Sequence, residues 1–248
     1  MRHLFAALFL SSAWIAAQAQ DLPPAIYEAA MRREMALLKQ GVVQRKPGEA
    51  EGAFVKRLFP ASFEEGSSLI RHTWRPSGYG PQLFFWHAER AEAHRLGEGT
   101  ELFVLDPIQP NTYAVQALLL EPIGDITNLL AFFFADVEQD GHQELLALVY
   151  AEVLEEGMLY AGPGDKGTPA YGRMSHWQTQ VFRYAGLSPA GRPRYQRDRT
   201  PRPYLNELSS AAQVRQALAR HQRRAKAGLL HASKISTLGR VAEPRPNP

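Results

Sequence analysis

The sequence lacks cysteine altogether, although it contains 248 residues. Disulfide bonds, thiolate metal sites, a cysteine nucleophile and a lipid-modified N-terminal cysteine are therefore excluded. Because no disulfide can stabilise the fold, its stability must come from the packing of a core. The chain is long enough to bury one sizeable core or two small ones.

Long hydrophobic segments are also scarce. The segment Leu4–Ala17 is almost entirely apolar, follows Arg2, and is continued by the small residue Ala19. At about 14 residues it is shorter than the roughly 20 residues that cross a bilayer, and its arrangement is typical of a secretory signal peptide. We expect residues 1–19 to be removed on export to the periplasm or the extracellular space, and we expect no membrane span in the mature protein.

Motifs of common catalytic sites are missing as well. Gly-x-Ser-x-Gly and His-Glu-x-x-His do not occur, which excludes the nucleophile elbow of α/β-hydrolases and the zinc-peptidase helix. The glycine-rich segment Gly162–Thr168 does not end in Gly-Lys-Ser/Thr, so it is not a Walker A phosphate loop. His87 and His94 are predicted to lie on different elements without a third ligand, and we interpret them as surface or packing residues.

Four carboxylates are predicted to lie on strands or at strand ends, namely Asp106, Asp125, Asp136 and Glu152. Glycoside hydrolysis requires two carboxylates a few ångströms apart, so a secreted hydrolase stays open as an alternative. Nothing in the sequence singles out one pair. We therefore assign no catalytic residue and favour a non-enzymatic protein.

Charge is nearly balanced, with 28 basic and 25 acidic residues, but the arginines are concentrated after Arg173. Two groups contain most of them: Arg192, Arg194, Arg197, Arg199 and Arg202, and then Arg215, Arg220, Arg223, Arg224 and Lys226. Such clusters can bind phosphate-rich partners. Because an exported protein rarely meets nucleic acid, we expect a solvated or envelope-facing surface and no nucleic-acid partner.

The middle of the chain is rich in short segments of branched, aromatic and long apolar residues, which predict β-strands. The expected strands are Leu69–Trp74, Gln82–His87, Leu102–Leu105, Tyr113–Leu120, Asn128–Ala135, Glu144–Val153 and Thr179–Tyr184. Phe132–Phe134 and Leu145–Tyr150 are almost wholly apolar, so we expect adjacent central strands covered on both faces. A sheet packed on a sheet, or a sheet backed by helices, would bury them.

Helices are expected near both ends. Pro23-Pro24 suits the first turn of a helix that Gly41 would end, and Ser209 or Ser210 would cap a second helix. The connecting segments are expected at Val43–Ala50, at Gly157–Ser175 as a long loop and at Leu187–Pro203 as an irregular segment, with short helices near Ser62 and at Ala88–Leu96.

These patterns predict an α+β, mainly β fold with an antiparallel sheet system and a helix at each end. The expected organisation is a signal peptide at 1–19, an N-terminal helix at 20–45, a β-rich domain at 46–208, a C-terminal helix packed on it at 209–227 and a disordered tail at 228–248.

The segment Asp136–Leu145 is the one place where residue types and spacing together suggest chemistry. Acidic residues alternate, a glycine follows the third, and apolar strand-like segments flank both sides. Calcium prefers six to eight oxygen ligands in a flexible cage. The predicted ligands are Asp136, Glu138, Asp140, His142 through its backbone carbonyl, and Glu144.

This segment resembles the short calcium-binding hairpins of FG-GAP and VCBS repeat proteins, whose pattern is Asp-x-Asn-x-Asp-Gly-x-x-Asp/Glu-Leu. The resemblance covers about ten residues and their flanking strands, with Glu138 in place of the usual shorter residue. It implies the same five ligands and a Ca²⁺ ion that stiffens the hairpin. An EF-hand does not fit, because its twelfth position is Ala147. A metal-free hairpin is the alternative, because Asp-Gly is itself a strong turn signal.

The sequence thus indicates an exported binding or structural protein of the cell envelope or the extracellular medium. Its partner would be an envelope or extracellular protein or a polysaccharide. Two alternatives remain open: the secreted hydrolase, and a periplasmic protein-inhibitor module. A protruding, well-ordered Gly157–Ser175 segment would favour the inhibitor.

Overall fold

The computed structural model describes residues 23–63, 67–86, 101–124, 126–159, 162 and 166–238. The expected signal peptide at 1–19 and the expected helix at Ala88–Leu96 lie outside these residues. None of the helices in the described ranges is long and apolar enough to cross a membrane.

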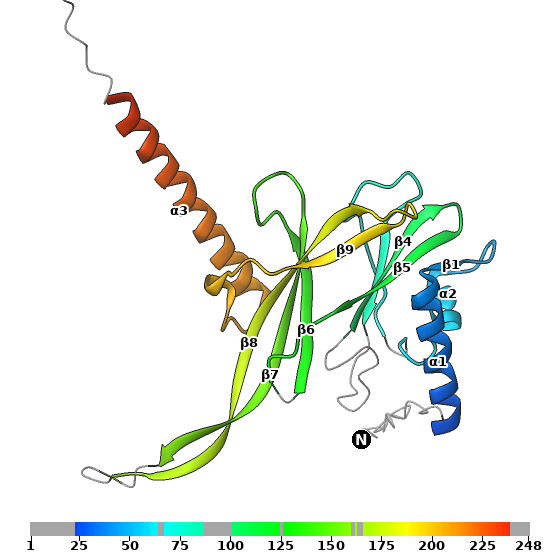
Figure 1. Ribbon diagram of the computed structural model, residues 1–248, viewed down its shortest axis with the longest axis horizontal. Helices are drawn as coiled ribbons and strands as arrows, with labels where there is room; N and C mark the ends of the chain where they lie inside the picture. Colours follow the sequence, from blue (N-terminus) through cyan, green and yellow to red (C-terminus); the bar gives the residue numbers. More distant parts are fainter. Residues whose placement is uncertain are drawn as a thin grey trace, which may run out of the picture.

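The described residues form two antiparallel sheets and flanking helices (Figure 1). The helices are α1 (Pro24–Gln40), α2 (Glu51–Leu58), the 3-10 helix η1 (Pro203–Leu205) and α3 (Ala211–Leu238). The strands are β1 (Val42–Gln44), β2 (Ile70–His72), β3 (Gln82–Trp86), β4 (Glu101–Gln109), β5 (Thr112–Leu119), β6 (Ile126–Ala135), β7 (Glu144–Leu159), β8 (Thr168–Leu187) and β9 (Pro193–Asp198).

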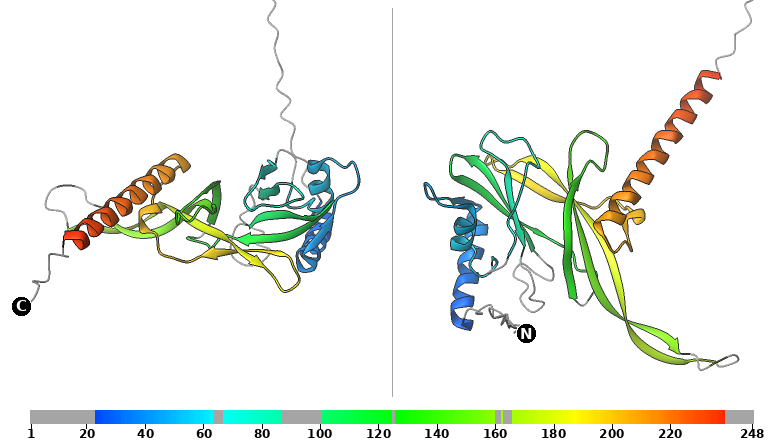
Figure 2. Two further views of the ribbon diagram at one scale, coloured as in Figure 1. Left: turned by 90° about the horizontal axis from the view of Figure 1, so that it is seen from above. Right: turned by 180° about the vertical axis from the view of Figure 1, so that it is seen from behind.

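The elements are stacked as four layers. Sheet A has the strand order β1-β5-β4-β3-β2, and sheet B has the order β6-β7-β8-β9. Helices α1 and α2 cover the outer face of sheet A, while the first part of α3 packs on the outer face of sheet B (Figure 1, Figure 2). The fold is therefore α+β and mainly β, as predicted, and both expected arrangements occur together: the sheets face each other and helices back each of them.

Because the side chains of each strand alternate between its two faces, the core is divided into three clusters. In β4, Phe103 and Leu105 pack against the N-terminal helices, while Leu102 and Val104 pack between the sheets. Strand β7 alternates in the same way between the inter-sheet core and the α3 side. Because successive side chains point to opposite faces of a strand, strands covered on both faces have almost continuous apolar sequences.

Helix α1 begins and ends where the sequence predicts. Gly41 takes the left-handed conformation with φ 71°, and its N–H donates to the carbonyl of Leu37 at 2.8 Å. The guanidinium of Arg192 lies where a side chain at position 41 would begin, and it donates to the carbonyl of Gln40 at 2.7 Å. Glycine is therefore required here both by the backbone conformation and by the close approach of a cation that stabilises the helix end.

Several local predictions were wrong. Helix α2 was not predicted: it begins directly after the segment expected to be a polar connector, and its apolar side is formed by Phe54, Val55 and Leu58. Strand β9 lies within the segment expected to be irregular, because proline is tolerated in an edge strand. Strand β6 is an edge strand of sheet B, not a central one.

The largest correction concerns Gly157–Ser175, which was expected to be a long loop. Strand β7 continues to Leu159 and β8 begins at Thr168, so most of this segment is a β-hairpin. Its glycines and charged residues conceal the strand pattern, because this hairpin does not pack on the core. Helix α3 ends at Leu238, beyond residue 227 where the sequence predicts its end.

Candidate functional site

The acidic segment connects β6 to β7 and forms the tip of their hairpin. Ala135 pairs with Glu144 at the base of this turn. Gln139 and Gly141 have positive φ values of 59° and 86°, which fold the loop back on itself. Glycine tolerates such a conformation without steric cost, so the Asp-Gly pair places the turn as the sequence indicated.

The aspartates in this loop accept hydrogen bonds from its own backbone. The two carboxylate oxygens of Asp136 accept from the N–H groups of Asp140 and Gly141, each at 3.1 Å. Oδ1 of Asp140 accepts from the N–H of His142 at 2.9 Å. Short side chains that bond to nearby backbone in this way stabilise tight turns.

Glu144 lies below the loop and is only 5% exposed. Its Oε2 accepts a hydrogen bond from the N–H of Val137 at 2.7 Å. Burial raises the pKa of this carboxyl group, and the nearby charges of Asp140, Asp136 and Glu138 raise the pKa further, against the opposing effect of the Val137 N–H. The other three carboxylates of the loop therefore lie close enough to destabilise the charged form of Glu144.

The loop is attached to three other parts of the fold. Gln222 of α3 donates from Nε2 to the carbonyl of Asp136 at 2.7 Å. The indole Nε1 of Trp74, from the segment after β2, donates to the carbonyl of Gln143 at 2.7 Å. Glu138 forms an ion pair with Arg202, which precedes η1. These contacts attach the loop to the segment after β2, to the segment before η1 and to the C-terminal helix.

The five predicted calcium ligands all lie in this loop, but their side chains do not form a cage. Within the described residues, no group of three or more Asp, Glu or His side chains is arranged to hold a metal ion. The carboxylate of Glu138 points to Arg202, while Asp136 and Asp140 accept bonds from the loop backbone. Binding of a cation by Glu138 would require its carboxylate to leave Arg202.

Two of the carboxylates considered for hydrolysis, Asp136 and Glu152, do not form a pair. Asp136 and Glu152 lie near opposite ends of the β6–β7 ladder, since Ala135 pairs with Glu144 and Ile126 pairs with Glu152. Eight residues along a strand span roughly 27 Å, which is far more than the about 5–9.5 Å of glycosidase pairs. Asp125 lies outside the described residues.

Asp106 is buried within the sandwich and is 1% exposed. Its oxygens accept two hydrogen bonds from Arg75, each at 2.7 Å, one from Gln82 at 3.3 Å and one from the hydroxyl of Tyr195. Burial, followed by the charge of Asp106, raises the pKa of the Tyr195 hydroxyl. This cluster joins β4 of sheet A to β9 of sheet B, so Asp106 stabilises the sandwich and is not accessible to a substrate.

The two longest strands continue beyond both sheets as a two-stranded arm, which we define as residues 153–159 and 168–174. Strand β6 accompanies β7 only as far as Glu152, and β9 accompanies β8 only from Val181. Seven register pairs, from Val153–Met174 to Leu159–Thr168, form the arm. Figure 1 and the right-hand view of Figure 2 show it extending away from the body. The outer edges of the arm have no neighbouring strand among the described residues.

The arm exposes large apolar side chains. Leu154 is 58% exposed, Tyr171 is 69% exposed and Met174 is 52% exposed. Sequence reasoning missed these residues because it placed them in or beside a loop. Their sequence gives no strand-like alternation, because Glu155 and Glu156 follow Leu154 directly and Gly172 follows Tyr171.

The base of the arm is fastened by a histidine between two glutamates. Nε2 of His176 lies 2.9 Å from Glu155, and its Nδ1 lies 3.3 Å from Glu207. Both carboxylates raise the pKa of His176, Glu207 more than Glu155. The backbone N–H of Glu207 also donates to the carbonyl of Trp177 at 2.8 Å. The segment before α3 therefore covers the outer edge of β8 at this point.

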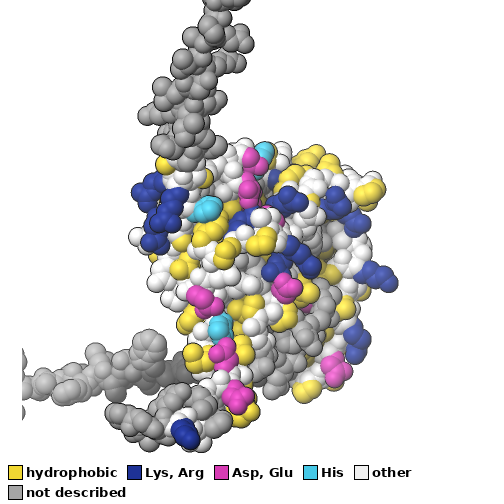
Figure 3. All heavy atoms as spheres, turned by 60° about the vertical axis from the view of Figure 1, so that its left-hand side comes forward, with side chains coloured by type: hydrophobic (Ala, Val, Ile, Leu, Met, Phe, Trp, Pro, Cys, Tyr) yellow, Lys and Arg dark blue, Asp and Glu magenta, His cyan; other side chains and the backbone are white. Residues whose placement is uncertain are grey.

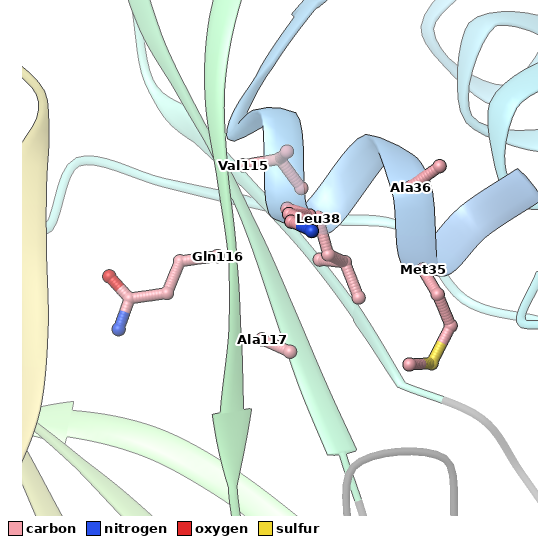
Figure 4. A pocket seen from close by; sticks show the side chains of 7 residues that line it. Met35, Ala36, Leu38, Val115, Gln116 and Ala117 are labelled. Atoms are coloured by element: carbon pink, nitrogen blue, oxygen red, sulfur yellow. The ribbon is translucent and has the colours of Figure 1, made fainter.

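An apolar groove lies between α1 and β5, with a volume of about 500 Å³. Met35 and Leu38 line it from the helix, and Val115 and Ala117 line it from the strand, while the side chain of Gln116 points away toward β9 (Figure 4). Its lining includes neither a carboxylate nor a histidine. Lys39 is the one titratable side chain among its lining residues.

Comparisons with protein-family models, with curated proteins and with solved structures found no match for this chain.

Proposed function

We propose that this protein is an exported binding protein that docks a partner protein through the β7–β8 arm, in the periplasm or outside the cell. The observation that supports this proposal is the exposure of Leu154, Tyr171 and Met174 on a projection that does not pack on the core. Apolar residues gathered at one exposed place indicate an interaction surface. The proposed export is supported by the N-terminal sequence.

Register places the exposed residues on both faces of the arm. Leu154 pairs with Arg173, and Tyr171 pairs with Glu156 two positions further along, so Leu154 and Tyr171 share one face. Met174 pairs with Val153 and lies on the other face. A two-stranded hairpin is marginally stable in water by itself. A partner that covers one or both faces would stabilise the arm by burying these side chains.

The edges of the arm favour a protein over a polysaccharide as the partner. Along the arm, at 153–159 of β7 and 168–174 of β8, the outer strand edges present backbone N–H and C=O groups, and an extended segment of another protein can pair with such an edge. The side chains of Leu154 and Met174 suit apolar protein surfaces. If the docked partner is an enzyme, the arm acts as an inhibitor module. Among the described residues, the carboxylates Asp106, Asp136 and Glu152 provide no pair that would support a hydrolase.

Site-specific photo-crosslinking in the source cells tests this proposal. A photoreactive phenylalanine analogue replaces Tyr171 in one variant and Tyr79 in a control, because Tyr79 is also exposed, at 54%, but lies before β3 of sheet A. We expect a discrete crosslinked protein from position 171 and none from position 79. A second substitution, Leu154→Ser, should abolish the product.

The crosslinking outcomes separate the possible partners. A product of defined mass that contains a second protein supports the proposal, and a product of twice the monomer mass identifies that protein as another copy of this chain. Absence of a discrete product at position 171, or equal products at both positions, would contradict it.

A structural Ca²⁺ ion in the β6–β7 loop is a second proposal. It is supported by the four neighbouring carboxylates and by the raised pKa of Glu144, because a cation would remove their mutual repulsion. A thermal melt in EDTA and in millimolar calcium tests it. Binding at 100 times the Kd stabilises a protein by about 2.7 kcal/mol, which is roughly 5–11 °C for a domain of this size.

The variants for this melt are Asp136→Ala/Asp140→Ala and, as a control, Glu28→Ala on α1. Calcium should raise the Tm of the wild type and the control but not that of the double variant. No rise in the wild type at any calcium concentration would reduce the loop to a metal-free hairpin.

A further inference from the structure

A small cleft lies between η1 and α3, on the opposite side of sheet B from sheet A. Tyr204, Ala217, Arg220, His221 and Arg224 line it, and its volume is about 220 Å³. Pockets for drug-sized ligands have volumes of about 300–1,000 Å³. This cleft therefore suits a compact group and not a whole cofactor or sugar chain.

The cleft is built on a fixed aromatic pair. The rings of Tyr204 and His221 are stacked, with centroids 3.9 Å apart and an interplanar angle of 5°. Arg220 and Arg224 are four residues apart in α3 and so lie on the same face, one turn from each other. Two guanidinium groups are thus presented beside a flat aromatic surface.

The positive charge of this cleft is not neutralised. Among the described residues no carboxylate lies within 4.0 Å of Arg220 or Arg224, and the sequence Ala211–Leu238 contains no Asp or Glu. Like charges at this spacing destabilise a helix. The space-filling view shows Lys and Arg side chains gathered on this side of the molecule (Figure 3). An anion between the two arginines would convert repulsion into attraction.

A second polar cleft, where β9 leaves β8, provides a contrast. Its volume is about 330 Å³ and it is also lined by arginines. Two of them already have partners: Arg197 pairs with Glu121, and Arg202 pairs with Asp198 and Glu138. The presence of arginines alone therefore does not indicate an anion site. The cleft on α3 differs from this second cleft because no carboxylate among the described residues neutralises its arginines.

We propose that the cleft of Tyr204, Arg220, His221 and Arg224 binds a phosphate group. Guanidinium groups bind phosphate oxygens in pairs of parallel hydrogen bonds, and a phosphate matches the small volume. The group is supplied either as a free phosphate or as the head group of an anionic lipid, and the same two arginines bind it in both cases.

Two binding measurements on the full mature protein test this proposal and distinguish the sources. Isothermal titration with inorganic phosphate, at constant ionic strength, detects a free anion. Flotation with phosphatidylglycerol vesicles, against phosphatidylcholine vesicles that have no net charge, detects a lipid head group. Saturable binding in either measurement is expected, and binding in neither would overturn the proposal.

A matched pair of double variants separates a site from general positive charge. Arg220→Gln/Arg224→Gln removes two charges from the cleft, and Arg223→Gln/Lys226→Gln removes two from the same helix outside it. All four residues are exposed, so circular dichroism should show folded variants. The cleft variant should bind about tenfold more weakly or worse, as expected for lost charge-assisted hydrogen bonds. Equal weakening of both variants would overturn the proposal.

Discussion

The two ends of strand β7 have different surroundings. At its start, Leu145–Val149 is fully covered, by sheet A on one face and by the α3 layer on the other. Beyond Glu152 only β8 accompanies the strand, and Leu154 is 58% exposed. The same strand thus serves the core at one end and projects into solvent at the other.

The two hairpins that share β7 differ in the same way. The β6–β7 loop is attached to the body through Gln222, Trp74 and Arg202. In the part of the chain that the structure describes, the arm is fastened at its base, where His176 lies between Glu155 and Glu207. We infer that the acidic hairpin stabilises the fold, while the arm is not needed for folding and is available to a partner.

The largest effect is expected in the body, at the cluster that joins the two sheets. Asp106→Ala would leave the guanidinium of Arg75 buried without its partner. Removing one member of a buried ion pair costs about 3–5 kcal/mol. Urea denaturation should show this loss of unfolding free energy. Glu152→Gln, which removes an exposed ion pair with Arg173 of the arm, should change it little. Similar losses in both variants would remove the distinction between the body and the arm.

Two leucines on one face of β7 provide the sharpest comparison. Leu148 is 1% exposed, and Leu154, six positions along, is 58% exposed. Leu148→Ala should cost about 2–5 kcal/mol because it leaves a cavity in the core. Leu154→Ala should change the unfolding free energy by no more than about 0.5 kcal/mol. A large loss from Leu154→Ala would show that the arm contributes to folding.

Burial and the neighbouring carboxylates destabilise the charged form of Glu144, so the stability of the acidic hairpin should depend on pH. The pKa of Glu144 in the folded protein is raised above 4.5, so its contribution to stability is present below that pH and is lost as pH rises through the folded pKa. Glu144→Gln resembles the protonated form. In calcium-free buffer the urea midpoint of the variant should exceed that of the wild type near neutral pH. The two midpoints should converge below pH 4.5; a constant difference would contradict the raised pKa.

The smallest effect is expected at the base of the arm, where the titration of His176 should change the stability of its contacts with Glu155 and Glu207. The pKa of His176 in the folded protein is raised above 6.5 by Glu207 and Glu155, so its stabilising charge is present below that pH and is lost as pH rises through the folded pKa. An NMR titration of the His176 ring should give a pKa above 6.5. Glu207→Gln should lower it, and an unchanged value would exclude this contact.

The sequence predicted those elements whose signals are local. Pro24 and Gly41 determine the bounds of α1, and the apolar segments on either side of Asp140-Gly141 determine the β6–β7 hairpin. The alternating acidic residues also located a loop in which three carboxylates raise the pKa of a fourth, that of Glu144. Whether that loop binds calcium stays a prediction.

Features that depend on distant residues could not be predicted. Tyr195 and Asp106 are 89 positions apart, so no local sequence pattern predicts their hydrogen bond. The arm was predicted to be a loop because Gly157 and Gly172 interrupt the strand pattern. Its strands form because β7 and β8 pair with each other along the whole arm. The cleft on α3 requires Tyr204 to stack on His221, which only the fold brings about.

Native-state hydrogen exchange along β7 tests the contrast between its two ends most directly. We predict that the amides of Leu145–Val149 exchange only through global unfolding, with opening free energies equal to the free energy from urea denaturation. Amides beyond Val153 should exchange through local opening of the arm, at much lower free energy. Equal opening free energies at both ends would contradict the account, because the arm would then be part of the cooperative core.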